Sequence, residues 1–174
     1  MAATVETYSY HGAESGAQIS NIRYNLADDN DQDETNKCVR PAVGTNLSWW
    51  TVIALYATVA PGTGINNIYL YTDGALAWAD CTVYIANDAG LSYDQATGST
   101  TSGDDMNGNY SGVTGKTDFY TYVTGEGNMK SIGGSIGAAT GKISDYVPLQ
   151  LAIGTSAVLG QQASETYTWQ YDET

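Results

Sequence analysis

The chain has 174 residues, and its 19 acidic side chains against 6 basic ones give a formal net charge of −13. A surface this acidic repels phosphate backbones and anionic lipids, which argues against nucleic-acid binding and against binding to a membrane surface. Hydrophobic residues make up 42% of the sequence, enough for the core of one domain spanning residues 1–174.

The composition favours β-structure throughout. Tyrosine occurs 14 times and glycine 20 times, whereas strong helix formers are scarce. Apolar and β-branched segments bounded by turn residues predict about eight strands in a single antiparallel β-sandwich, of the jelly-roll or immunoglobulin-like type. In chain order these segments are 4–10, 19–25, 49–59, 65–72, 75–78, 81–86, 118–124, 147–153 and 167–171.

Three of these segments carry more specific predictions. Segment 49–59 is apolar at nearly every position, so it is expected to be a central strand or a strand covered on both faces. The Asp73-Gly74 pair predicts a tight hairpin that leads into segment 75–78. In segment 118–124 the alternation of Phe119, Thr121 and Val123 with two tyrosines predicts a strand.

Two long polar stretches, 27–45 and 87–116, interrupt the strands. Loops of this length without regular structure are uncommon in a compact domain and are often functional. Two interpretations remain open: exposed decoration of the sandwich, or contact loops that become ordered against a neighbouring molecule.

The sequence does not predict an enzyme. Its only histidine, His11, has no arrangement with serine and aspartate that follows a known triad order, so neither a triad nor a histidine-based metal site is expected. His11 is expected at the surface near a strand end. A pair of carboxylates from distant strands remains open as a hydrolytic centre, but the spacing favours no particular pair.

An acidic run covers residues 28–34. Asp29, Asp31 and Asp33 match the opening of a calcium-binding loop, but an EF-hand would need glycine and glutamate where Glu34 and Arg40 stand. Two hypotheses follow: a looser calcium site on Asp29, Asp31 and Asp33, or a solvated acidic loop. No other cofactor is expected.

Tryptophans and cysteines complete the candidate residues. Trp49, Trp50, Trp78 and Trp169 are candidates for an interface or for stacking against a sugar ring, although core packing is the commoner fate of tryptophan. Cys38 and Cys81 could form a disulfide in an oxidising compartment, but two buried free thiols are the preferred interpretation.

Three stretches resemble small virion proteins of tailed viruses of bacteria and archaea. The first is Ile19-Ser20-Asn21-Ile22-Arg23-Tyr24 followed by Ala27-Asp28-Asp29-Asn30. The second, 65–74, is similar to the family's central NNIRFYTDG strand, with Tyr69-Leu70 in place of Arg-Phe, and the third, 165–173, is similar to its closing ETxTFQYDE strand. The resemblance covers about a third of the chain and supplies no catalytic residues.

The resemblance implies a non-enzymatic structural role in a virus particle, as a capsid decoration or cement protein or another component of the particle surface. The chain is then made in the host cytoplasm and released within the virion, which agrees with an N-terminus that lacks a signal peptide. Its expected partners are copies of itself and a capsid or tail subunit. Two alternatives remain: a glycan-binding β-sandwich module on a virus or cell surface, and a filament or surface-layer subunit that donates an edge strand.

Overall fold

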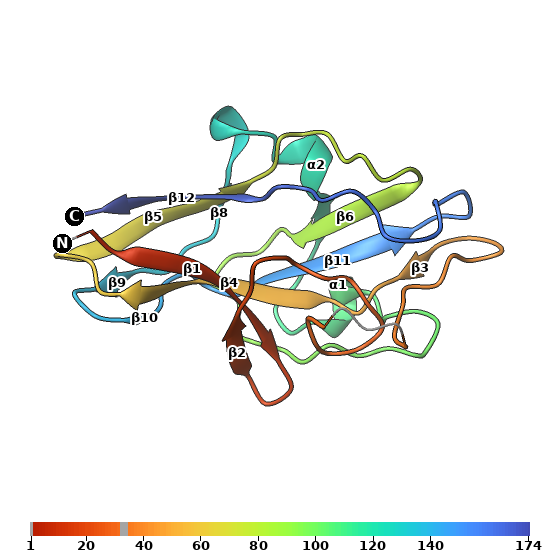
Figure 1. The fold of residues 1–174 in the computed structure, drawn as a ribbon, viewed down its shortest axis with the longest axis horizontal. Coiled ribbons are helices and arrows are strands. Elements are labelled where there is room, and N and C mark those ends of the chain that lie inside the picture. The colour runs from red at the N-terminus through yellow and green to blue at the C-terminus, as the bar shows by residue number, and fades with distance from the viewer. Residues whose placement is uncertain (1, 32–34) are drawn as a thin grey trace.

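The computed structural model describes residues 2–31 and 35–174, and it confirms an all-β, sandwich-like single domain with almost no helix. Within those residues, twelve strands form one eight-stranded and one four-stranded antiparallel sheet. In Figure 1, β12 and β5 of the smaller sheet lie above β1 and β4 of the larger sheet. The strands are β1 (Thr4–His11), β2 (Ser15–Gln18), β3 (Asn46–Leu47), β4 (Thr51–Val59), β5 (Gly64–Tyr71), β6 (Cys81–Ala86), β7 (Lys116–Asp118), β8 (Lys130–Ser131), β9 (Ile136–Gly137), β10 (Gly141–Lys142), β11 (Val147–Ile153) and β12 (Thr168–Glu173).

The order of the strands places both chain ends on one side of the sandwich. The larger sheet runs β2-β1-β4-β11-β6-β7, with β10 also on β4 and β3 on β11, and the smaller runs β12-β5-β8, with β9 also on β5. The start of the chain lies beside β12, an edge strand of the smaller sheet, because the Ala3 backbone N–H donates to Glu173 Oε1 at 2.8 Å. Figure 1 accordingly shows the N- and C-termini side by side.

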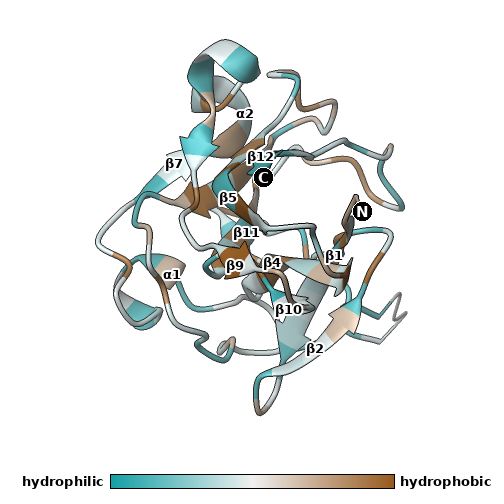
Figure 2. Cartoon of the chain, turned by 90° about the vertical axis from the view of Figure 1, so that its left-hand side faces the viewer, coloured by the Kyte–Doolittle hydropathy of each residue, from teal (hydrophilic) through white to brown (hydrophobic). Residues whose placement is uncertain are grey.

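The main core fills the space between the two sheets. Inward-facing residues of β4, β6 and β11 meet those of β5, and Figure 2 shows the apolar brown segments of β5 and β9 in the middle of the molecule. The alternation of Val147, Leu149, Leu151 and Ile153 turns these four side chains toward this core, as the sequence predicts. Burial of these apolar faces is the main force that holds the two sheets together.

A second core covers the opposite face of the larger sheet. The stretch 87–116 supplies Leu91, Met106, Tyr110 and Val113, which pack against Trp50 and its neighbours on β4. This arrangement confirms that segment 49–59 is covered on both faces. It also shows that 87–116 packs against its own sheet, so exposed decoration does not describe this stretch. The loop contains the short helix α1 (Met106–Asn109).

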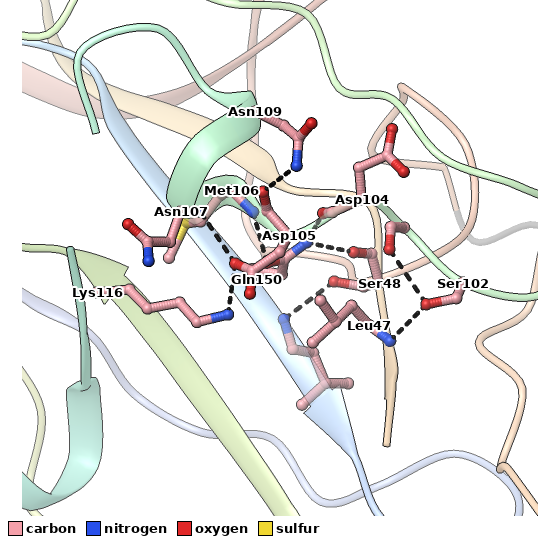
Figure 3. A network of polar contacts seen from close by, with 12 residues as sticks. Leu47, Ser48, Ser102, Asp104, Asp105, Met106, Asn107, Asn109, Lys116 and Gln150 are labelled. Atoms are coloured by element: carbon pink, nitrogen blue, oxygen red, sulfur yellow. Dashed lines mark hydrogen bonds and ion pairs between the residues drawn. The ribbon is translucent and has the colours of Figure 1, made fainter. Parts of the chain in front are cut away.

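A buried glutamine anchors the stretch 87–116 to β11. Gln150 is 0% exposed, and its Nε2 donates to the carbonyl oxygens of Ser48, at 2.8 Å, and Asp104, at 2.7 Å. Its Oε1 accepts from the Met106 backbone N–H at 3.1 Å. Figure 3 shows these bonds beside the ion pair of Lys116 Nζ with Asp105 Oδ1, 2.6 Å apart. A polar loop can therefore cover a sheet because its backbone groups find buried partners.

Segment 19–25 is not a strand, and the reason is local hydrogen bonding. The Asn30 side chain bonds to one backbone donor and one backbone acceptor of this segment. Its Oδ1 accepts from the Arg23 backbone N–H at 2.8 Å, and its Nδ2 donates to the Asn21 carbonyl oxygen at 2.9 Å. An amide side chain thus takes the place of a neighbouring strand. The prediction of a strand at 19–25 was wrong.

Segment 75–78 also departs from its predicted strand. The Asp73 side chain accepts from the Ala75 backbone N–H at 3.0 Å, which forms an Asx turn instead of a two-residue hairpin. Gly74 has a φ of 83°, and the Ala77 backbone N–H donates to Glu165 Oε1 at 2.8 Å. The Asp73-Gly74 pair therefore turns the chain, but no returning strand follows.

Segment 118–124 is not a strand either, so this prediction was wrong. The observed strand β7 ends at Asp118, where the predicted strand would begin, and Asp118 Oδ1 accepts from the backbone N–H groups of Tyr120, at 3.0 Å, and Thr121, at 3.2 Å. This N-cap starts the one-turn helix α2 (Phe119–Tyr122), and the 3₁₀ turn η1 (Glu126–Asn128) follows it. Phe119 and Tyr120 of this short helix are buried in the main core.

Candidate functional site

A cavity of about 550 Å3 opens on the side of the sandwich where β1 and β12 lie. Its lining includes Ile53 on β4 and Leu151 and Ile153 on β11, together with Thr7 on β1 and Trp169 on β12. The volume falls within the range of about 300–1,000 Å3 that is typical of small-molecule sites. We therefore take this cavity as the candidate functional site.

Three irregular segments complete the cavity: 19–25, 37–40 and 157–165. Hydrogen bonds join them across long sequence distances, since Arg40 Nη1 donates to Ala157 O at 3.2 Å and Cys38 Sγ donates to Tyr24 O at 3.3 Å. The cavity is thus a product of the tertiary fold, because no one segment contributes more than a part of its wall.

Four aromatic residues of the described part of the chain line the cavity, and their polar ends are bound to the protein. Trp78 Nε1 donates to Ala163 O at 2.7 Å, and Trp169 Nε1 donates to Thr7 Oγ1 at 3.1 Å. The hydroxyls of Tyr24 and Tyr167 are 2.9 Å apart, and burial raises the pKa of both, so they remain protonated at neutral pH. The indoles therefore have ring surface, and not N–H groups, to offer a ligand.

The four candidate tryptophans fall into two pairs. Trp78 and Trp169 line the cavity, whereas Trp49 and Trp50 lie in the second core on the far face of the larger sheet. Trp50 is 2% exposed, and its Nε1 donates to Asp94 O at 3.1 Å, so it has no free face for a ligand. Trp49 is partly exposed, and its Nε1 donates to Ser99 O at 3.2 Å.

Both cysteines lie on the cavity wall and carry free thiols. Burial and the neighbouring Cys81 raise the pKa of Cys38 to about 12. Burial, and to a lesser degree the Asp80 carboxylate, also raise the pKa of Cys81. Neither thiol is therefore activated as a nucleophile or a metal ligand at neutral pH.

The acidic run gives no metal centre among the described residues, in which no group of three or more His, Cys, Asp or Glu side chains is placed to hold an ion. Asp29 Oδ1 accepts from Asn25 Nδ2 at 2.6 Å and from Asp31 N at 3.1 Å, so this carboxylate stabilises its own loop. Asp33, the third predicted ligand, lies outside the described residues. The calcium hypothesis remains a prediction.

The structure brings together a serine, a histidine and an aspartate that the sequence analysis did not connect. His11 Nε2 is 2.8 Å from Ser9 Oγ, and His11 Nδ1 is 4.0 Å from Asp28 Oδ1. Ser9 and His11 are two residues apart on β1, so their side chains lie on the same face of the sheet. The two-residue period of a strand could have indicated this proximity from the sequence. Asp28 reaches them because its Oδ2 accepts from the Gly12 backbone N–H at 2.6 Å.

The contacts from Ser9 to His11 to Asp28 follow the order of a catalytic triad, but the site lacks the access for a substrate that such a triad requires. Ser9 is 0% exposed, and its backbone lies in the ladder between β2 and β4, so no carbonyl substrate reaches its hydroxyl. A nucleophilic serine also needs free backbone N–H donors beside it for the oxyanion. We interpret the three residues as a structural link between β1 and the loop at 25–31.

Comparison with known protein families, with curated proteins and with solved structures finds no match to this chain. Among the described residues, no helix has the length and apolar character needed to cross a membrane. The site therefore has to be interpreted from its own chemistry.

The pKa of His11 gives a first prediction. Burial lowers it below the usual 6.5, against the smaller opposing effects of Asp28, Asp29 and Asp31. The folded state then binds fewer protons than the unfolded state, so stability present above about pH 6.5 is lost as the pH falls through the folded-state pKa. We expect Tm to fall between about pH 7.5 and about pH 5.5, and to fall less in His11→Asn. Equal falls in both proteins would contradict the prediction.

The two thiols give a second prediction, on alkylation rates. With its pKa at about 12, only about one Cys38 thiol in ten thousand is ionised at pH 8. We expect iodoacetamide to modify Cys81 about tenfold faster than Cys38 under native conditions. Cys38→Ser and Cys81→Ser assign the two rates by mass spectrometry. Faster modification of Cys38 would mean that segment 37–40 opens readily.

Proposed function

We propose that this protein is a non-enzymatic structural component of a virus particle, most specifically a capsid decoration or cement protein at the particle surface. The observation that supports the proposal is that the three stretches resembling small virion proteins bind one another in the fold. Tyr24, in the first stretch, meets Tyr167, in the third, through their hydroxyls. The second and third stretches pair as β5 and β12.

The pairing of β5 with β12 gives the recurring residues a structural reason. Ile65 is opposite Glu173 and Asn66 is opposite Asp172, whereas Asn67 falls at an irregularity in the register. Asn67 has a φ of 49°, a left-handed conformation that asparagine tolerates better than most residues, and its Nδ2 donates to Asp172 Oδ2 at 2.7 Å. The Asn-Asn and Tyr-Asp-Glu motifs are therefore two halves of one strand pairing, as expected of a structural family.

Exposed apolar side chains suggest where such a protein contacts a particle. Val39 and Val43 lie in the stretch 27–45, and Val158 and Leu159 lie in the loop that follows β11; Leu159 is 70% exposed. The hydrogen bond from Arg40 to Ala157 joins residues 39–43 to the loop that follows β11, and Figure 1 shows residues 40–45 and that loop at the end of the molecule opposite the termini. In the proposed role, many copies bind a repetitive lattice, so each contact can be modest.

The direct test of this proposal is the protein composition of purified virus particles. Particles banded in a density gradient from the source culture should contain this chain at a fixed ratio to the major capsid protein, measured by quantitative mass spectrometry. Recovery of the chain only in the soluble fraction would contradict a role in the virion. The same proposal includes self-association, so light scattering of the purified protein should give a mass above the 18.4 kDa of one chain.

A pair of matched variants locates the contact. Leu159→Asp adds a charge among the exposed apolar side chains of these two loops, called the apolar loops below. Particles stripped of this protein should rebind the wild-type chain but not the Leu159→Asp variant. Tyr122→Asp adds the same charge to an exposed aromatic residue on α2, away from those loops, and should rebind like the wild type. Equal rebinding of both variants would remove the apolar loops as the contact surface.

A further inference from the structure

The cavity on the side of β1 and β12 combines aromatic faces with planar polar groups. Trp78 and Trp169 are both partly exposed, and their indole N–H groups are bound to protein acceptors. Trp78 also packs against Tyr24 edge to face, with ring centroids 6.1 Å apart. Such rings are held in place, so a ligand that stacks on them does not have to order them first.

A carboxylate is fixed next to one of these rings. Glu165 Oε1 accepts from the backbone N–H of Ala77, the residue before Trp78, at 2.8 Å. A carboxylate can accept several hydrogen bonds in addition to this one. Arg40 donates one of its five N–H groups to Ala157 O and also lines the cavity. Acceptors and donors therefore stand beside an apolar face within one cavity.

The charges of the cavity wall favour a neutral ligand. Although the chain has only six basic residues, three of them line the cavity, Arg23, Lys37 and Arg40, together with the acidic Asp31 and Glu165. A strongly charged ligand of either sign would meet like charges there. A purely aliphatic ligand would instead bury the polar side chains without replacing their hydrogen bonds to water.

We propose that this cavity binds a neutral pyranose sugar, with the apolar C–H face of the ring on Trp78 and its hydroxyls bonded to Glu165 and Arg40. A pyranose has one apolar face and a rim of hydroxyls that both donate and accept, which matches the cavity wall. Polarised C–H groups are attracted to the electron-rich face of an indole. The inference does not depend on the proposed place of the protein in a virion.

The four tryptophans provide an internal control for the test. In a ¹H–¹⁵N spectrum of the whole protein, the indole N–H signals of Trp78 and Trp169 should shift on addition of millimolar methyl glucoside, methyl mannoside, methyl galactoside or N-acetylglucosamine. The signals of Trp49 and Trp50, outside the cavity, should remain in place. No shift with any of these sugars overturns the proposal. Shifts with cyclohexanol or glucuronate, but with none of the neutral sugars, also overturn it.

Variants separate ring stacking from general stability. Trp78→Leu should weaken sugar binding about tenfold, whereas Trp78→Phe, which keeps an aromatic face, should retain most of it. Trp49→Leu is the matched control and should bind like the wild type, because Trp49 is on the far face of the larger sheet. Equal weakening by Trp49→Leu and Trp78→Leu would mean that the loss reflects stability alone, and would overturn the assignment of the site.

Discussion

Replacing Gln150 with leucine is expected to lower the free energy of unfolding by about 3–5 kcal/mol and Tm by about 10 °C. The substitution keeps the size of the side chain but removes three hydrogen bonds at a fully buried position. The Ser48 and Asp104 carbonyls and the Met106 N–H are then left without that partner. Each buried polar group without a partner costs about 1–3 kcal/mol, so the loss exceeds that of an exposed hydrogen bond.

Thermal unfolding and hydrogen exchange measure this effect and its location. Gln170→Leu is the matched control, because Gln170 is an exposed glutamine on β12, and it should change stability by less than about 0.5 kcal/mol. Backbone amides of the stretch 87–116 should exchange faster in Gln150→Leu, while those of β5 and β12 should not. If Gln150→Leu is as stable as the wild type, the buried amide does not anchor that stretch.

The role of Gln150 also shows why the second core was not predictable from the sequence. The stretch 87–116 is rich in polar residues and glycine, and its few apolar side chains follow neither a strand nor a helix period. Their burial depends on the backbone groups of Asp104 and Met106, which find their partner in Gln150 on β11, far away in the sequence. By contrast, the local alternation on 4–10 and 147–153, and the β-branched and aromatic residues of 65–72 between turn residues, were sufficient to predict β1, β11 and β5.

The candidate site was predictable only in part, for a similar reason. Trp78 and Trp169 were candidates because of their residue type, and the structure places both on the cavity wall. Trp50 was a candidate for the same reason, but it is buried by the stretch 87–116. The cavity is lined by residues that lie far apart in the sequence, the first being Thr7 and the last Trp169. No spacing pattern in the sequence indicates that they come together in the fold. A ring's exposure is a tertiary property, so residue type alone cannot separate a binding tryptophan from a core tryptophan.

Replacing Phe119 with alanine is the second change with a large expected effect, a loss of about 3–5 kcal/mol. Phe119 is the only phenylalanine of the chain, and it is completely buried between the sheets. Its ring centroid lies 5.2 Å from that of Tyr167, the tyrosine that meets Tyr24 at the cavity. Removal of the ring therefore leaves a void in the main core and also removes support from the cavity wall.

The helix α2 and the strand predicted for the same residues can be distinguished by the neighbours of Phe119. In a strand, Thr121 shares the buried face of Phe119, whereas in α2 Tyr120 is buried with Phe119 and Thr121 is exposed. Urea unfolding should therefore show a loss of about 3 kcal/mol or more in the free energy of unfolding for Tyr120→Ala and a much smaller loss for Thr121→Val.

Asp118 explains why these residues form a helix and not a strand, because its carboxylate caps two backbone N–H groups that a strand would direct to a neighbouring strand. Asp118→Ala should cost about 1 kcal/mol through the loss of this cap, and a neutral result would show that core packing of Phe119 and Tyr120 alone selects the helix.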